Sequence, residues 1–218
     1  MDLKIGEITN ISGVEKELEE LGVSEIIPYG PKGYKKGWRG FVFKARINNK
    51  TAALKVTEKA EKEASLLQLA NSVGVGPEFI AKTGHIVAMQ FLDGPLYPEW
   101  LETAERGEVK KVVINVLEQA YELDKLGLSH GQLSNAYRHI IVCEKPYIID
   151  FEKGSSDSTC RNFLAILNYL LLNPHSAIAA KTRAKLNIGA TEITAYARKY
   201  TIQKEEAFQE VRSRLLKA

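Results

Sequence analysis

The sequence predicts an α+β protein of two lobes, in which a β-rich N-lobe precedes a mostly helical C-lobe. In residues 41–56 apolar side chains alternate with polar ones, which is typical of β-strands. In residues 108–127 they recur every three or four positions instead, as in a helix that packs one face against a core. A chain of 218 residues with 44% apolar content is long enough for two small lobes that share a cleft.

Turn signals divide the first half into strands and helices. Asn48 and Asn49 stand between two apolar runs, and asparagine tolerates the positive φ of a tight hairpin turn. The elements expected here, in order, are a short amphipathic helix within residues 13–23, which Gly22 closes, a hairpin over 41–56, a helix at 59–72, and two strands on either side of residues 82–84.

Longer periodic segments follow Gly94. The helix at 108–127 ends at Gly127, the residue type that most often follows a helix C-terminus. Two short strands at 139–143 and 146–150 come next, and then helices at about 159–172, 175–186, 191–200 and 203–216. We therefore expect an N-terminal extension at 1–29, the N-lobe at 30–92 and the C-lobe at 93–218.

Composition and charge restrict the setting of the protein. The net charge of +3 argues neither for nor against nucleic acid, but residues 181–218 carry nine Lys and Arg against four Glu. This excess indicates either a solvated helical face or contact with a phosphate-rich or acidic partner. The two cysteines have no metal-ligand spacing and the N-terminus is polar, so a reduced, cytoplasmic protein is expected. The longest apolar run, 163–172, is too short to span a bilayer.

Two glycines mark a turn in the N-lobe that could approach phosphate groups. Gly37 and Gly40 precede Val42 within a strand–turn–strand segment, and glycine lets backbone amides come close to a ligand. A plain hairpin turn explains the same pair. The basic side chains of the same turn, at Lys35, Lys36 and Arg39, favour an anionic ligand.

A lysine inside an apolar strand is the second feature of the N-lobe. Lys55 follows three apolar residues, and an unpaired ammonium is costly to bury. Glu63, on the following helix, can supply the missing anion. The alternative is a lysine whose tip reaches water.

The C-lobe contributes a carboxylate and a histidine. Asp150 ends a short apolar strand, where it can serve as a Mg²⁺ ligand or as a turn cap. His130 lies in the loop before the paired strands, and we expect it to pack and to bond the backbone rather than to transfer a proton.

The order of these parts resembles the site of a protein kinase. A glycine turn, a strand lysine, a helix glutamate, a hinge, a His-Gly loop and a strand-end aspartate follow one another between Tyr34 and Leu172. The chain is similar to archaeal serine/threonine kinases of minimal size, to RIO kinases and to the KEOPS-complex kinase. The resemblance implies a bilobal protein-kinase-like fold that binds ATP and Mg²⁺.

Residue by residue, the resemblance assigns the ATP-binding positions. Gly37, Gly40 and Val42 match the glycine-rich loop, whose first glycine is Lys35 here. Lys55 matches the lysine that grips the α- and β-phosphates, and Glu63 matches its partner. Met89 falls at the gatekeeper position and Gln90 to Leu92 at the hinge. Asp150 matches the metal-binding aspartate of Asp-Phe-Gly, whose glycine is Glu152 here.

Two departures affect the catalytic loop. Gln132 replaces the catalytic aspartate, and an amide cannot accept a proton at neutral pH. Tyr137 replaces the metal-binding asparagine, and either Asn135 or His139 can stand in for it.

Three hypotheses follow. The first is an ATP- and Mg²⁺-dependent phosphotransferase with Lys55, Asp150 and Gln132 as catalytic residues, acting on an unidentified protein substrate or partner. The second is a pseudokinase or ATP-binding scaffold, which the changed catalytic loop favours. The third is a nucleic-acid-associated factor that uses the basic C-terminal helices.

Overall fold

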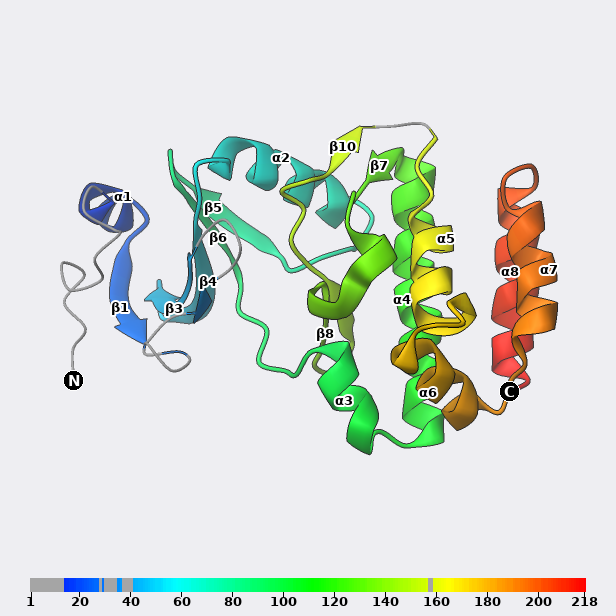
Figure 1. The fold of residues 1–218 in the computed structure, drawn as a ribbon. Coiled ribbons are helices and arrows are strands. Elements are labelled where there is room, and N and C mark those ends of the chain that lie inside the picture. The colour runs from blue at the N-terminus through cyan, green and yellow to red at the C-terminus, as the bar shows by residue number, and fades with distance from the viewer. Residues whose placement is uncertain (1–13, 28, 30–34, 37–40, 157–158) are drawn as a thin grey trace. The chain divides into compact units, whose positions relative to one another are not determined.

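The computed structural model describes residues 14–27, 29, 35–36, 41–156 and 159–218, which form two compact units. The first unit comprises Met1–Ser72 and Gly76–Leu92, and the second comprises Val73–Val75 and Asp93–Ala218. Strands dominate the first unit and helices dominate the second (Figure 1). The predicted α+β class, with an antiparallel sheet before a helical part, is confirmed.

The first unit is built on one antiparallel sheet. Its strands are β1 (Val23–Ile27), β2 (Lys35–Lys36), β3 (Phe41–Ile47), β4 (Lys50–Val56), β5 (Phe79–Lys82) and β6 (Ile86–Gln90). They follow the order β1-β3-β4-β6-β5, with β2 also paired to β3. The hairpin between β3 and β4 turns at Asn48 and Asn49, whose φ angles are 48° and 63° as the sequence predicted. Strand β1 was not predicted.

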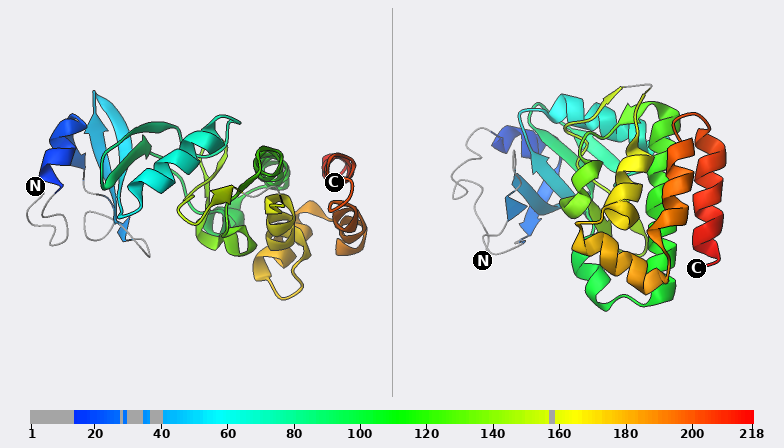
Figure 2. Two further views of the ribbon diagram at one scale, coloured as in Figure 1. Left: turned by 90° about the horizontal axis from the view of Figure 1, so that it is seen from above. Right: turned by 45° about the vertical axis from the view of Figure 1, so that its right-hand side comes forward.

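Each face of this sheet packs against a different helix. Phe43, Leu54 and Ala88 point to one face, where α1 (Glu15–Glu20) contributes Leu18 to a shared core. Side chains alternate along a strand, so Lys55 points to the opposite face, which α2 (Ala60–Asn71) covers (Figure 2). The apolar alternation in β3 and β4 therefore leaves the lysine on the α2 side.

The second unit surrounds a long central helix, α4 (Arg106–Leu126). The predicted apolar stripe of α4 is buried, and Gly127 ends the helix with φ 71°. The other elements are α3 (Tyr97–Thr103), β7 (Leu128–Ser129), the 3₁₀ helix η2 (Leu133–Arg138), β8 (Ile140–Val142), β9 (Pro146–Ile148), β10 (Ser155–Ser156), α5 (Asn162–Leu167), the π-helical turn η3 (Asn168–Leu172), α6 (Ala177–Leu186), α7 (Ala190–Lys199) and α8 (Lys204–Leu216). The single helix expected over 159–172 is thus an α-helix, α5, that continues as the short π-helix η3.

No single helix in the described residues combines the length and the apolar character needed to cross a membrane. The bent pair Asn162–Leu172 and Ala177–Leu186 meets that test jointly, by length and composition. Its apolar side chains, among them Phe163, Leu167 and Leu170, are buried within the second unit.

Candidate functional site

A buried ion pair is the main polar feature of the first unit. Lys55 on β4 donates from Nζ to Oε1 of Glu63 on α2 at 2.8 Å. The two residues are only 9% and 2% exposed. The pair predicted from the sequence is therefore present. Its two charges can be buried because they are close and hydrogen-bonded to each other. Such a lysine, fixed by its carboxylate partner, can hold an anion at the sheet surface.

A row of apolar side chains lies beside Lys55 on the same face of the sheet. Val42 pairs with Lys55 across β3 and β4, and Met89 pairs with Ala53 across β6 and β4. Ala53 and Lys55 are two residues apart on one strand, so these four side chains share a face. Flat apolar surface next to a cation is the combination that a nucleotide base and its phosphates require.

The predicted hinge, Gln90 to Leu92, begins at the last residue of β6. The Gln90 amide donates to Glu78 O at 2.8 Å, and Leu92 is 7% exposed. Phe91 lies under the Lys44 ammonium, with the nitrogen 4.3 Å from the ring centroid. The hinge backbone is thus held at Gln90. Gly37 and Gly40, the predicted phosphate-loop glycines, lie outside the described residues.

The His-Gly-Gln loop of the second unit is fixed by its histidine. His130 is fully buried, its Nε2 donates to Ile149 O at 3.0 Å, and its ring packs 4.9 Å from that of Phe151. Burial, with a smaller contribution from His139, lowers the pKa of His130 to about 4. His130 is therefore neutral at neutral pH and joins the loop to the strand end, the structural role expected from the sequence.

Gln132 presents an acceptor from this loop. It stands at the N-cap of η2, and its Oε1 is buried without a hydrogen-bond partner among the described residues. A buried carbonyl oxygen that is left unsatisfied is costly, so a ligand hydroxyl or water that donates to it is favoured. The oxygen cannot act as a base at neutral pH, but it can orient a donor.

Gly131 shows how tightly this loop packs. Its φ is +79°, and a Cβ atom there would lie 2.8 Å from Lys153 O in the segment after Asp150. We expect Gly131→Ala to lower the free energy of unfolding by about 1–3 kcal/mol, because strain and a backbone clash add. Urea unfolding followed by circular dichroism measures this. The matched control is Gly107→Ala on α4, where nothing lies within 4 Å; equal losses in both variants would contradict the prediction.

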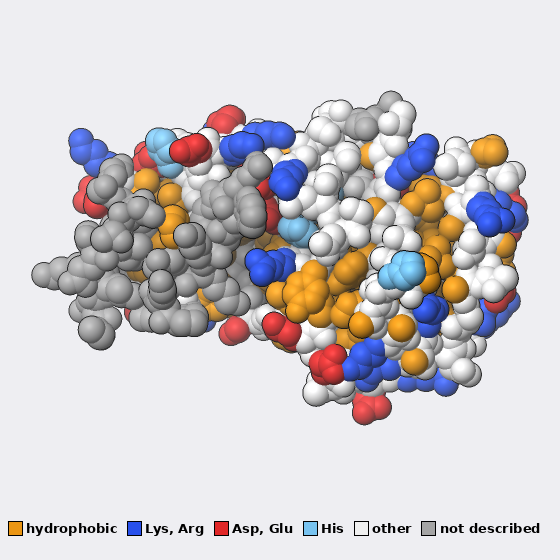
Figure 3. Space-filling view, viewed as in Figure 1, with side chains coloured by type: hydrophobic (Ala, Val, Ile, Leu, Met, Phe, Trp, Pro, Cys, Tyr) orange, Lys and Arg blue, Asp and Glu red, His pale blue; other side chains and the backbone are white. Residues whose placement is uncertain are grey.

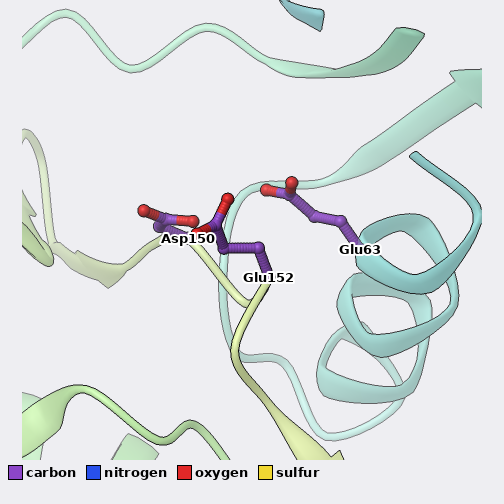
Figure 4. A group of neighbouring side chains, drawn as sticks. All are labelled: Glu63, Asp150 and Glu152. Carbon is purple, nitrogen blue, oxygen red and sulfur yellow. The ribbon is translucent and has the colours of Figure 1, made fainter. Parts of the chain in front are cut away.

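Two carboxylates stand on either side of Phe151. Asp150 has a φ of 72°, a strained conformation that is often kept at functional sites. Its carboxylate oxygen and that of Glu152, which is 5% exposed, lie within 4.8 Å of each other (Figure 4). Figure 4 also shows the carboxylate of Glu63 at the end of its side chain on α2. Sequence reasoning noted Glu152 only as a departure from glycine and missed its place beside Asp150.

The donor set on this loop fits a hard divalent cation. Mg²⁺ prefers carboxylate oxygens together with phosphate oxygens and water. Asp150 and Glu152 supply two such oxygens, whereas His139 offers an imidazole that packs edge-on to His130 at 5.5 Å. Tyr137, at the position of the expected asparagine, is 48% exposed. The carboxylate pair is therefore the better fit to Mg²⁺.

Four of the nine basic residues from Lys181 onward form ion pairs with acidic side chains in the structure. Lys199 contacts Glu210 at 2.7 Å, and Arg212 contacts Glu118 at 2.8 Å. Basic and acidic side chains are interspersed over the helical unit (Figure 3). These pairs neutralise part of the local positive charge, so binding of nucleic acid there stays a prediction.

Comparisons with known proteins agree with this arrangement. The RIO domain family matches residues 32–162, more than half of the chain. An uncharacterized protein of Methanocaldococcus jannaschii is 33% identical over 115 residues, which are 51% of this chain and 97% of that protein. RIO domains are members of the protein-kinase-like superfamily, an ATP-binding group of atypical kinases. The chain belongs to the RIO-domain family.

Proposed function

We propose that this protein is an ATP- and Mg²⁺-dependent phosphotransferase that resembles a small serine/threonine kinase. The observation that carries the proposal is the buried pair of Lys55 and Glu63 beside the apolar row of Val42, Ala53 and Met89. Lys55 would hold the α- and β-phosphates, Glu63 would orient Lys55, and the apolar row with the hinge would receive adenine.

The second unit would supply the remaining groups. Asp150, with Glu152, would hold a Mg²⁺ ion, which supplies charge neutralisation of the phosphates. Gln132 would orient the acceptor hydroxyl through Oε1. The γ-phosphorus then gains a bond to the acceptor oxygen as its bond to the β–γ bridging oxygen breaks, and ADP leaves. Because Gln132 cannot take the proton, the proton passes to water or to a phosphoryl oxygen; a loose transition state makes little demand on a base.

A second candidate function is an ATP-binding scaffold without turnover. It is favoured by Gln132 and Tyr137, which replace the aspartate and the asparagine of the kinase catalytic loop. Gln132 lacks the basic oxygen of aspartate, and a general base contributes about 10²- to 10⁴-fold to rate. In a scaffold, the unsatisfied oxygen of Gln132 and the exposed side chain of Tyr137 would take part in binding and not in phosphoryl transfer.

Transfer of γ-labelled phosphate from ATP separates the two candidates. We expect label to pass from Mg·ATP to a protein acceptor, to the protein itself or to water above the background of a Lys55→Ala control. We also expect Gln132→Asp to leave the rate unchanged or to lower it, because the glutamine is used. A gain of about 10²-fold or more in Gln132→Asp would favour the scaffold, since it would restore a missing base.

The control for that assay is nucleotide binding. Both candidates predict that ATP binds, so equilibrium binding of a fluorescent ATP analogue is measured beside transfer. Binding without transfer in the wild-type protein would contradict the phosphotransferase proposal and favour the scaffold, and absence of both would contradict both candidates.

A further inference from the structure

A buried carboxylate connects three elements of the second unit. Asp124, near the end of α4, is 4% exposed and accepts four hydrogen bonds. Its Oδ1 accepts from the amide of Asn162 at 2.7 Å and from Nδ2 of that residue at 2.9 Å. Its Oδ2 accepts from the amide of Phe163 at 3.1 Å and from the Tyr200 hydroxyl at 2.7 Å. A carboxylate has about four lone-pair sites, so this one is fully used.

Asn162 passes this connection to the His-Gly-Gln loop. Its Nδ2 also donates to Leu128 O at 2.7 Å, and its Oδ1 accepts from the His130 amide at 2.9 Å. Both hydrogens of Nδ2 are therefore used, and Asp124, which only accepts, determines which end of the side-chain amide is Nδ2. Asn162 thus holds the backbone at Leu128 and at His130, and His130 is two residues before Gln132.

Tyr200 closes the far end of the chain of hydrogen bonds. It is fully buried at the end of α7, stacked on Phe163 with the ring centroids 4.5 Å apart. Burial and the neighbouring Asp124 raise the pKa of Tyr200 above its usual value. The hydroxyl therefore keeps its proton and donates a hydrogen bond to Oδ2 of Asp124. Figure 2 shows α7 and α8 side by side within this unit, and α8 also packs against α4.

The position of Tyr200 in the chain is informative. The RIO domain match ends at residue 162, so Asn162 lies at its edge and Tyr200 lies outside it. A helix beyond the matched domain thus supplies the last donor of a network that ends at the His130 amide.

We propose that Tyr200 and Asp124 are positioning residues for phosphoryl transfer and that α7 belongs to the catalytic machinery of this protein. The proposal rests on the phosphotransferase function above. Through Asn162 the two residues set the backbone of the loop that carries Gln132. Small displacements of a group that positions a reactant lower the rate strongly, because the reacting atoms leave the aligned geometry.

Tyr200→Phe is the appropriate test, since it removes one hydroxyl and keeps the ring that stacks on Phe163. We expect kcat for transfer to fall about 3- to 10-fold, because only part of the free energy of one hydrogen bond to a charged group is passed on to the loop, while KM for Mg·ATP is unchanged. KM is expected to stay unchanged because the network ends at the backbone amide of His130, in the loop that carries Gln132, and Gln132 orients the acceptor rather than Mg·ATP. Amide hydrogen exchange of residues 128–132 should also become faster.

A matched control is available in the same unit. Tyr97 is also fully buried, and its hydroxyl bonds Thr182 Oγ1 at 2.9 Å, a partner on α6 rather than on the loop. Tyr97→Phe should lower the melting temperature comparably but leave kcat and the exchange of 128–132 unchanged.

The possible outcomes separate the two proposals. Unchanged exchange and kcat in Tyr200→Phe, or equal changes in Tyr97→Phe, would overturn the positioning role. Faster exchange with unchanged kcat would overturn it as well, since the loop would move without consequence for transfer. If the wild-type protein transfers no phosphate, the proposed function fails, and with it the catalytic role of Tyr200; the exchange measurement would still decide whether Tyr200 holds the loop.

Discussion

Asp150→Asn should lower phosphoryl transfer by about 10³-fold or more while the protein stays folded. Asparagine has the size of aspartate and is one of the few residues that tolerate the φ of 72° at this position. The substitution therefore removes a negative charge and changes little else. Loss of that charge weakens the binding of Mg²⁺, on which neutralisation of the phosphate oxygens depends. Initial rates of label transfer measure the effect.

Two further variants make this result interpretable. Asp150→Ala should be equally inactive but less stable by about 1–2 kcal/mol, because alanine is strained at a positive φ. Glu99→Gln removes one carboxylate charge from an exposed position on α3 and should change neither rate nor stability. A rate for Asp150→Asn close to that of the wild type would show that Asp150 does not hold the metal ion. Mn²⁺ binding, measured by electron paramagnetic resonance, tests for loss of metal affinity independently of turnover.

The second large effect concerns the buried pair of Lys55 and Glu63. Lys55→Met should abolish transfer and lower the free energy of unfolding by about 3–5 kcal/mol, since it leaves the Glu63 carboxylate buried without the lysine. The double variant Lys55→Met/Glu63→Leu should recover much of that stability, because two apolar side chains of similar volume replace the pair. It should not recover transfer, because the ammonium group that would hold the α- and β-phosphates is still missing. Urea unfolding and label transfer give the two readouts.

An exposed pair on neighbouring elements is the control. Lys82 on β5 contacts Glu61 on α2, and their side chains are 36% and 76% exposed. Lys82→Met should lower the free energy of unfolding by at most about 1 kcal/mol, as is usual for surface ion pairs. If Lys55→Met cost no more than this control, or if the double variant transferred phosphate at the wild-type rate, the role given to the pair would be wrong.

Local patterns predicted much of this fold. The apolar stripe of α4, the turn at Asn48 and Asn49, and the hairpin of β3 and β4 are all present. Periodicity and turn chemistry act over a few residues, so they can be read from neighbouring positions. Pairing of Lys55 with Glu63 was also accessible, because a strand lysine and a helix carboxylate only eight residues apart are brought together by one short connection.

Other elements depend on contacts that local patterns do not reveal. Strand β1 pairs with β3 across about twenty residues, and β7 pairs with β10 across a similar interval. The π-turn that follows α5 has the same apolar composition as a regular helix. Asp124 lies on the apolar side of α4, a position at which a carboxylate could have signalled a buried network, yet its partners are 38 and 76 residues away.

The sequence by itself determined the α+β class, the order of the kinase-like residues and the pairing of Lys55 with Glu63, because these follow from side-chain periodicity and from charges that need a nearby partner. The tertiary structure alone decided the strained Asp150 with Glu152 beside it, the tight contact of Gly131, and the route from Tyr200 to His130. Those features arise where distant segments are packed together, and buried polar groups take whichever partners the packing brings within reach.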